Sequence, residues 1–147
     1  MSLQDTQAAI SAAVTPVVMI SANAILIGAI SSKHQSMSDR LRALTAEWRN
    51  PATPSDRREA IESQVRLFDN RLRWVTWSHI VLYTATANFI AMVIVIAASP
   101  HLESLSGASL GLLIAGVALM FLGILLELFD LAKARATLAL EMKDVVG

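Results

Sequence analysis

The chain contains no cysteine among its 147 residues, which excludes disulfides, thiolate catalysis and Cys-based zinc or iron–sulfur sites. Charge is scarce as well, because Asp, Glu, Lys and Arg make up only 16% of the sequence. Basic and acidic residues balance at 12 each, and this balance argues against a general nucleic-acid-binding protein. The sequence also lacks phosphate-loop and dinucleotide-binding glycine motifs and Cys/His zinc patterns. It has no catalytic constellation of serine, histidine and carboxylate. These absences favour a non-enzymatic protein with no cofactor and no nucleic-acid partner.

Apolar residues dominate instead, at 54% of the chain, with a mean hydropathy of +0.54. Three runs contain no Asp, Glu, Lys or Arg, namely 6–32, 74–102 and 104–126. Each run exceeds the roughly 20 residues that an α-helix needs to cross a bilayer. Segments such as IAMVIVIAA and LLIAGVALMFLGILL have no polar face for water, which disfavours the buried helices of a soluble bundle. The sequence therefore predicts an all-α integral membrane protein with three transmembrane helices that contact the lipid bilayer.

The first run is preceded by MSLQD, without the basic residues of a signal peptide, so we expect it to be a retained transmembrane helix. We predict one membrane domain over 1–147, with transmembrane helices at about residues 8–32, 74–98 and 107–131. A helical hairpin is expected at about 33–73 with its turn at 50–54, and a helical C-terminal extension at about 132–144.

Lys and Arg are confined to two regions, nine of them between Lys33 and Arg73 and three after the third run. Three spans place these two regions on the same side, which the positive-inside rule makes the cytoplasm. Trp74 and Trp77 stand at the inner edge of the second span, where an aromatic belt is expected. We predict a multi-pass protein of the bacterial inner membrane, with its N-terminus outside and its C-terminus cytoplasmic.

The segment SSKHQSMSDRLRAL at 31–44 contains no Pro or Gly, which predicts that the first membrane helix continues beyond the bilayer. Apolar residues recur on both sides of the 50–54 turn at intervals of 4, 3 and 4. One antiparallel register pairs them all, as Met37 with Leu72, Leu41 with Phe68, Leu44 with Val65, and Trp48 with Ile61. This pattern is typical of an antiparallel coiled coil, and the alternative is a hairpin that lies flat on the lipid surface.

The same register places Arg40 near Asp69 and Asp39 near Arg71. We therefore expect these two exposed ion pairs to help set the register of the hairpin while adding little stability.

The segments TPVVMISANAILIGAISSKHQSMSDRLRAL and LELFDLAKARATLALEMKD resemble a family of small bacterial membrane proteins catalogued as domain of unknown function 2721. The matching positions are Asp39, Arg40, Arg42, Ala43 and Leu44 in the first segment, and Glu127, Leu138, Leu140 and Glu141 in the second. The resemblance covers nearly the whole chain and implies a three-span bacterial inner-membrane protein. It implies no activity.

Two carboxylates near the inner end of the third span, Glu127 and Asp130, are the main candidates for handling an ion or a proton, because a carboxylate in lipid is costly. The alternative is that they pair with a base from the first or second helix. His79 lies at a similar depth to Glu127 and is a third ion-handling candidate. His34 and His79 lie near the inner surface on different helices and could together ligate a haem, but a single histidine pair is weak evidence for a haem site.

Candidate helix-packing residues lie within the spans, where amides and small residues hold membrane helices together. They are Asn23, Asn88, Gly107, Gly111, Gly116 and Gly123. On the third span, Gly107, Gly111, Ala115 and Ala118 share one face, and Gly116, Gly123, Glu127 and Asp130 share the opposite face. One face is expected to pack within the chain and the other against a second copy, unless the chain's own helices cover both.

Two hypotheses for the function remain. The first is a scaffolding or interaction module, homo-oligomeric, whose coiled-coil hairpin binds an unidentified cytoplasmic or membrane protein. The second is an oligomeric ion channel or transport pathway lined by the Glu127 and Asp130 face of the third span.

Overall fold

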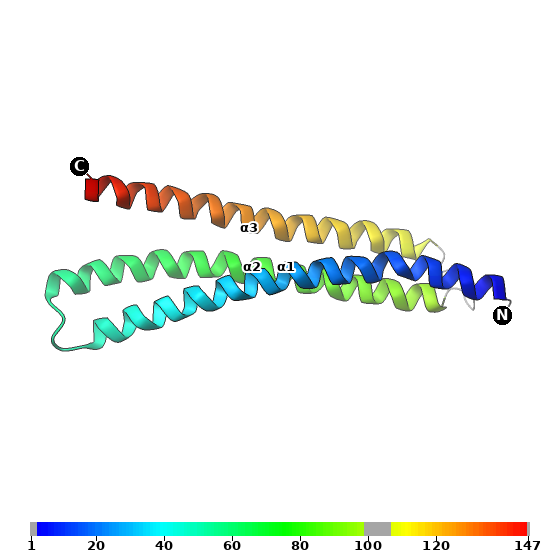
Figure 1. The fold of residues 1–147 in the computed structure, drawn as a ribbon, viewed down its shortest axis with the longest axis horizontal. Coiled ribbons are helices and arrows are strands. Elements are labelled where there is room, and N and C mark those ends of the chain that lie inside the picture. Colours follow the sequence, from blue (N-terminus) through cyan, green and yellow to red (C-terminus); the bar gives the residue numbers. More distant parts are fainter. Residues whose placement is uncertain (1–2, 99–106, 147) are drawn as a thin grey trace. The chain divides into compact units, whose positions relative to one another are not determined.

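Within the residues that the structure describes, the chain forms three long helices, α1 (Leu3–Arg49), α2 (Ser55–Ala98) and α3 (Ala108–Val146), as Figure 1 shows. This computed structural model describes the backbone of residues 3–98 and 107–146, and their side chains except those of 3–6, 8, 9 and 135–146. No strand occurs in these described ranges. All three helices are long and apolar enough to cross a membrane, which confirms the prediction of an all-α protein with three spanning helices.

Both α1 and α2 are much longer than a bilayer requires. At ~1.5 Å per residue, the 47 residues of α1 and the 44 residues of α2 each extend over about 65–70 Å, against a hydrocarbon thickness of about 30 Å. α1 runs through residues 31–44 without a break, and α3 continues past residue 132 to Val146. The side chains of Leu138, Leu140 and Glu141 lie outside the described residues.

The helices contribute to two compact units. Unit 1 contains residues 1–28 and 79–123, and unit 2 contains residues 29–78 and 124–147. The three uncharged runs supply most of unit 1, and unit 2 holds the hairpin between α1 and α2 and the second part of α3.

In unit 1, Asn23 joins α1 to α2. Its side chain is fully buried, and its Nδ2 donates to the backbone oxygen of Leu82 and to Oγ1 of Thr86, each at 2.7 Å. Such interhelical amide bonds stabilise membrane helix pairs by about 0.6–2 kcal/mol. Asn88 on α2 is half-buried, with a carbonyl oxygen that has no hydrogen-bond partner.

The two small-residue faces of α3 have different surroundings in unit 1. A Cβ added to Gly116 would lie 2.5 Å from Cε1 of Phe89, and one added to Gly123 would lie 2.6 Å from Cδ2 of Leu82, so α3 approaches α2 closely along this face. On the opposite face, a Cβ at Gly111, or at Gly107 directly before the start of α3, would meet no atom of the described residues within 4 Å outside the adjoining backbone. The chain therefore packs α3 through its Gly116–Gly123 face.

Hydroxyl groups on the exposed surface of the spans are satisfied by their own helix. Ser21 donates to the backbone oxygen of Val17 at 3.1 Å, and Thr84 donates to that of Ile80 at 2.8 Å. A hydroxyl bonded in this way needs neither water nor a partner helix, so this surface is compatible with lipid.

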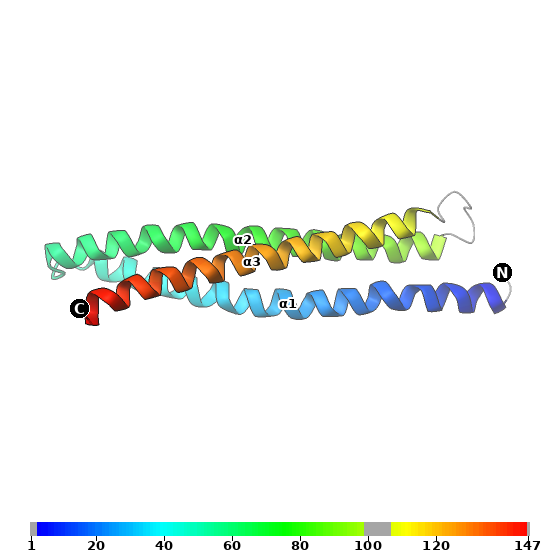
Figure 2. The same ribbon diagram turned by 90° about the horizontal axis from the view of Figure 1, so that it is seen from above.

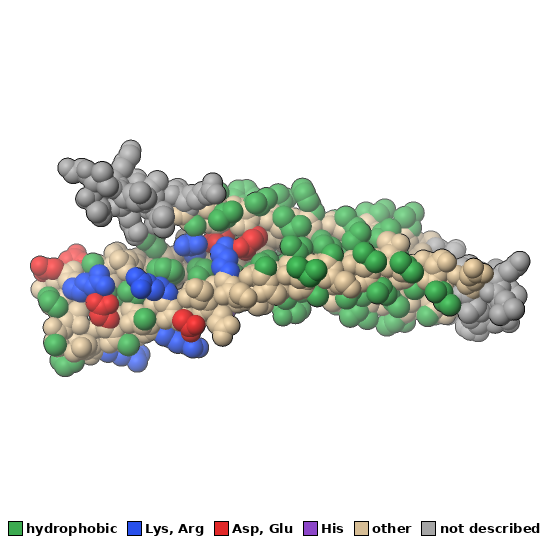
Figure 3. Space-filling model, in the orientation of Figure 1, with side chains coloured by type: hydrophobic (Ala, Val, Ile, Leu, Met, Phe, Trp, Pro, Cys, Tyr) green, Lys and Arg blue, Asp and Glu red, His purple; other side chains and the backbone are tan. Residues whose placement is uncertain are grey.

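Unit 2 contains the antiparallel hairpin, in which α1 and α2 run side by side toward the 50–54 turn (Figures 1 and 2). Of the predicted core residues, Met37, Leu44 and Ile61 are buried, and Leu41, Val65, Phe68 and Leu72 are half-buried. Trp48 differs from the expectation, because 41% of it remains exposed. On the face shown in Figure 3, charged side chains gather over this hairpin.

Candidate functional site

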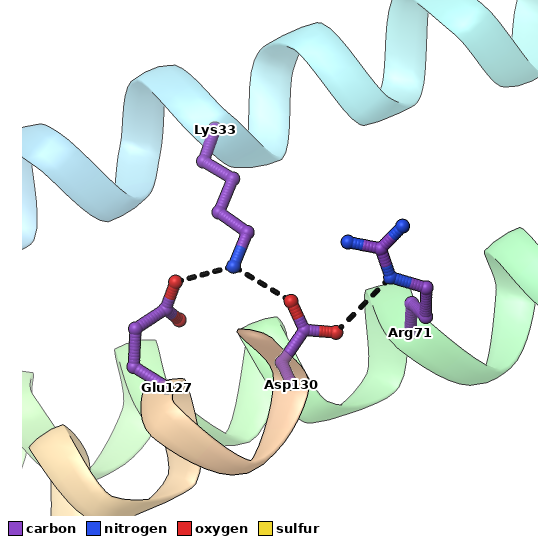
Figure 4. A network of polar contacts seen from close by, with 4 residues as sticks. All are labelled: Lys33, Arg71, Glu127 and Asp130. Atoms are coloured by element: carbon purple, nitrogen blue, oxygen red, sulfur yellow. Dashed lines mark hydrogen bonds and ion pairs between the residues drawn. The ribbon is translucent and has the colours of Figure 1, made fainter. Parts of the chain in front are cut away.

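All three helices of unit 2 contribute a charged side chain to one place. We call Lys33, Arg71, Glu127 and Asp130 the charge cluster (Figure 4). Lys33 comes from α1, directly after the first uncharged run, and Arg71 comes from α2, just before the second. Glu127 and Asp130 lie three residues apart on α3, which places both carboxylates on one face of that helix.

The four side chains form a continuous chain of ion pairs. Nζ of Lys33 lies 2.5 Å from Oε1 of Glu127 and 2.6 Å from Oδ2 of Asp130. Nε of Arg71 lies 3.3 Å from Oδ1 of Asp130 (Figure 4). One ammonium therefore bridges two carboxylates, and Asp130 is held by a cation from each of the other two helices.

Burial is concentrated on Asp130, whose side chain is 1% exposed, whereas about a quarter of each of the other three remains exposed. A buried carboxylate is tolerated only when cations and hydrogen bonds offset its lost hydration. The two positive and two negative charges sum to zero. Oε2 of Glu127 and Oδ2 of Asp130 are both buried without a hydrogen bond, but Oδ2 of Asp130 lies 2.6 Å from Nζ of Lys33, so Glu127 is the less fully compensated carboxylate.

The sequence identified the two carboxylates and left open whether they handle an ion or pair with a base. The structure places Glu127 and Asp130 together, each with a basic partner from α1 or α2. Lys33 and Arg71 were not identified as those partners from the sequence. A signal for them exists, because Lys33, Arg71 and Glu127 all stand within three residues of an end of an uncharged run.

Aromatic side chains lie near the predicted inner edge of the spans. His79, the third ion-handling candidate, stacks on Tyr83 with ring centroids 6.2 Å apart. In unit 2, Nζ of Lys133 lies 4.7 Å from the ring centroid of Trp74, which is a cation–π contact between α3 and α2. No group of three or more His, Asp or Glu side chains that could hold a metal ion occurs among the described residues.

The tip of the hairpin is closed by hydrogen bonds. Glu47 accepts from both Nε and Nη2 of Arg57, at 2.8 and 3.1 Å, and its backbone oxygen accepts from Oγ1 of Thr53 at 2.7 Å. Nη2 of Arg58 donates to the backbone oxygen of Asn50 at 3.0 Å. These bonds satisfy the carbonyl of Glu47 in the last turn of α1 and that of Asn50 directly after it, so the turn has a defined conformation.

The two ion pairs expected from the hairpin register are not the ones that form. Within the part of the chain that the structure describes, Asp39 pairs with Arg42 of its own helix at 3.5 Å, and Arg71 pairs with Asp130. The prediction was wrong because it considered only the two hairpin legs, whereas α3 supplies a more buried carboxylate to Arg71.

Residues 13–140 match the model of a family described as "Protein of unknown function (DUF2721)". No curated protein and no solved structure matches the chain.

Proposed function

The chain belongs to this family of proteins of unknown function, DUF2721, and from that premise we propose that it is a non-enzymatic membrane protein that presents its α1–α2 hairpin to other proteins. The observation that carries the proposal is the charge cluster, which joins both legs of the hairpin to α3. A hairpin held at its base and closed at its tip is a preorganised surface, and preorganisation lowers the entropy cost of binding.

The proposal includes an orientation. Nine Lys and Arg residues between Lys33 and Arg73, and none in the N-terminal tail or the 99–109 connection, support a cytoplasmic hairpin. We propose a bacterial inner-membrane protein with its N-terminus outside and its C-terminus inside. Because the chain has no cysteine, Ser63→Cys provides a single reporter on the exposed side of α2. A membrane-impermeant maleimide is expected to label it only after cells are opened, and labelling of intact cells would contradict this orientation.

The interaction role is tested by the proteins that co-purify with the full-length chain from its native membrane. We expect a stoichiometric partner that is lost when the hairpin tip is changed by Glu59→Lys, because Glu59 is exposed and forms no ion pair or hydrogen bond in the described structure. The matched control is Asp69→Lys, an equal charge reversal at an exposed position away from the tip. A partner retained by both variants, or no partner beyond the chain itself, would contradict a tip-dependent interaction role.

Self-association is part of the proposal. Gly111 on α3 and Gly107 directly before α3 are exposed, and among the described residues a Cβ at either glycine would meet no atom within 4 Å outside the adjoining backbone. Small residues allow membrane helices to approach closely, so the face that carries them suits a second copy. Native mass spectrometry from mild detergent is expected to show one closed oligomer, and a monomer would contradict this part of the proposal.

The alternative of an ion pathway along the Glu127 and Asp130 face receives less support. Both carboxylates are engaged by Lys33 and Arg71, and Gly116 on the same face of α3 packs against Phe89. A pathway along this face requires these contacts to open. Cation flux in liposomes that falls with Glu127→Gln would favour the pathway over the interaction role.

A further inference from the structure

The hairpin has an apolar hollow between α1 and α2, with a volume of about 300 Å³. It is lined by Thr45, Trp48, Ile61, Glu62, Val65 and Arg66, which all belong to unit 2. Ile61 is fully buried, whereas 41% of Trp48 is exposed. Water replaces lipid around a hairpin that extends beyond the bilayer, and an exposed tryptophan beside an apolar hollow is then typical of a protein interface.

The rim of the hollow carries one charge of each sign on α2. Nη2 of Arg66 lies 3.9 Å from Oε2 of Glu62, and these side chains are 82% and 52% exposed. A pair this exposed contributes little within the chain, so both groups remain available for other partners. A two-fold interface places residue i of one copy against residue j of the other and the reverse, and a rim with one carboxylate and one guanidinium complements itself in that arrangement.

The membrane adds a second argument for an identical partner. Two copies inserted in the same direction hold their hollows at the same distance from the bilayer, and confinement to one membrane raises their effective concentration. We infer that a second copy of this chain covers the hollow through a two-fold contact, in which Trp48 of each copy packs over the hollow of the other and Glu62 pairs with Arg66 across the interface. The inference rests on the proposed role of the hairpin as an interaction surface.

The absence of native cysteine allows a direct test in the full-length chain in its membrane. Thr45→Cys places a thiol in the wall of the hollow. Ser63→Cys is the matched control, because it is exposed and stands two residues from both Ile61 and Val65, which places it on the other side of α2. A short bismaleimide is expected to link Thr45→Cys into a dimer and to leave Ser63→Cys monomeric. Equal linking of both variants, or none at Thr45→Cys, would overturn the inference.

Charge reversal separates a second copy from a foreign partner. In the Thr45→Cys background, Glu62→Arg or Arg66→Glu alone creates a rim of one sign and is expected to lower dimer formation about tenfold. The double swap restores a complementary rim and the dimer, and mixing the two single variants yields mixed dimers. Asp39→Arg reverses one partner of the exposed Asp39–Arg42 pair, which does not line the hollow, and is expected to have no effect. A double swap as defective as the single variants, with helix content unchanged, would refute self-pairing.

Two further results separate this inference from the proposed function. Cross-linking of Gly111→Cys without cross-linking of Thr45→Cys would mean that copies meet through α3, so the hollow is not the interface. If Thr45→Cys forms no cross-linked dimer but a tip-dependent partner still co-purifies, only the inference is overturned. If there is neither a Thr45→Cys dimer nor a tip-dependent partner, the interaction role is overturned as well.

Discussion

Lys33→Met is the most informative change to the charge cluster, because it removes one charge and keeps the aliphatic stem. The ammonium lies 2.5 Å from Glu127 and 2.6 Å from Asp130, so two carboxylates lose a cation at once. Removing one partner of a buried ion pair costs about 3–5 kcal/mol. Asp130 keeps Arg71 at 3.3 Å and Glu127 is a quarter exposed, so we expect a loss at or just below the lower end of that range, ~2–3 kcal/mol.

The assay is the unfolding free energy of the full-length protein in mixed micelles titrated with SDS, followed by far-ultraviolet circular dichroism. Glu127→Gln alone is expected to cost less than about 1 kcal/mol, because Lys33 keeps its contact with Asp130. The double variant Lys33→Met with Glu127→Gln leaves one cation on one carboxylate. It is therefore expected to recover at least about half of the Lys33→Met loss, as a coupling energy between contacting residues.

An exposed ion pair supplies the control. Asp39 and Arg42 lie 3.5 Å apart with side chains 64% and 82% exposed, so Asp39→Asn is expected to change stability by less than about 0.5 kcal/mol. The reasoning is refuted if Lys33→Met is as mild as this control, or if the losses from Lys33→Met and Glu127→Gln simply add.

Two further predictions use the same titration. Gly116→Ala is expected to destabilise the protein by about 1–3 kcal/mol, because its Cβ would lie 2.5 Å from Phe89, whereas the added Cβ of Gly28→Ala would meet nothing within 4 Å and should be neutral or slightly stabilising. Equal effects of the two alanines would contradict the close approach of α3 and α2. Asn23→Leu is expected to cost about 0.6–2 kcal/mol through the loss of two interhelical hydrogen bonds, whereas Ser21→Ala, which removes a bond within one helix, should cost less. A larger loss from Ser21→Ala would argue against an interhelical role for Asn23.

The charge cluster also shows how a buried carboxylate is accommodated near a membrane. Asp130 is 1% exposed and would be unfavourable there as an isolated anion. Cations from two other helices offset that cost, and the pairing is satisfied only when all three helices are in place. The cluster therefore specifies the arrangement of the helices as much as it stabilises them.

Hydropathy and helix-forming composition were sufficient to predict three helices, each long and apolar enough to cross a bilayer, because both signals are local and extend over 20 or more residues. They also identified Glu127 and Asp130, since a carboxylate beside an uncharged run is conspicuous in the sequence itself. The family followed from the sequence as well, and the match over residues 13–140 confirms it.

Only the tertiary structure decided which side chains meet. Lys33 and Glu127 are 94 residues apart in the sequence. Arg71 pairs with Asp130 of α3, and not with Asp39, which the hairpin register places near it. The same holds for α3, whose sequence has two small-residue faces, of which the structure packs the Gly116 and Gly123 face against α2. The physical reason is that helix periodicity defines what each face of a helix carries, whereas the rotation of that helix against its neighbours depends on packing and charge from all three helices together.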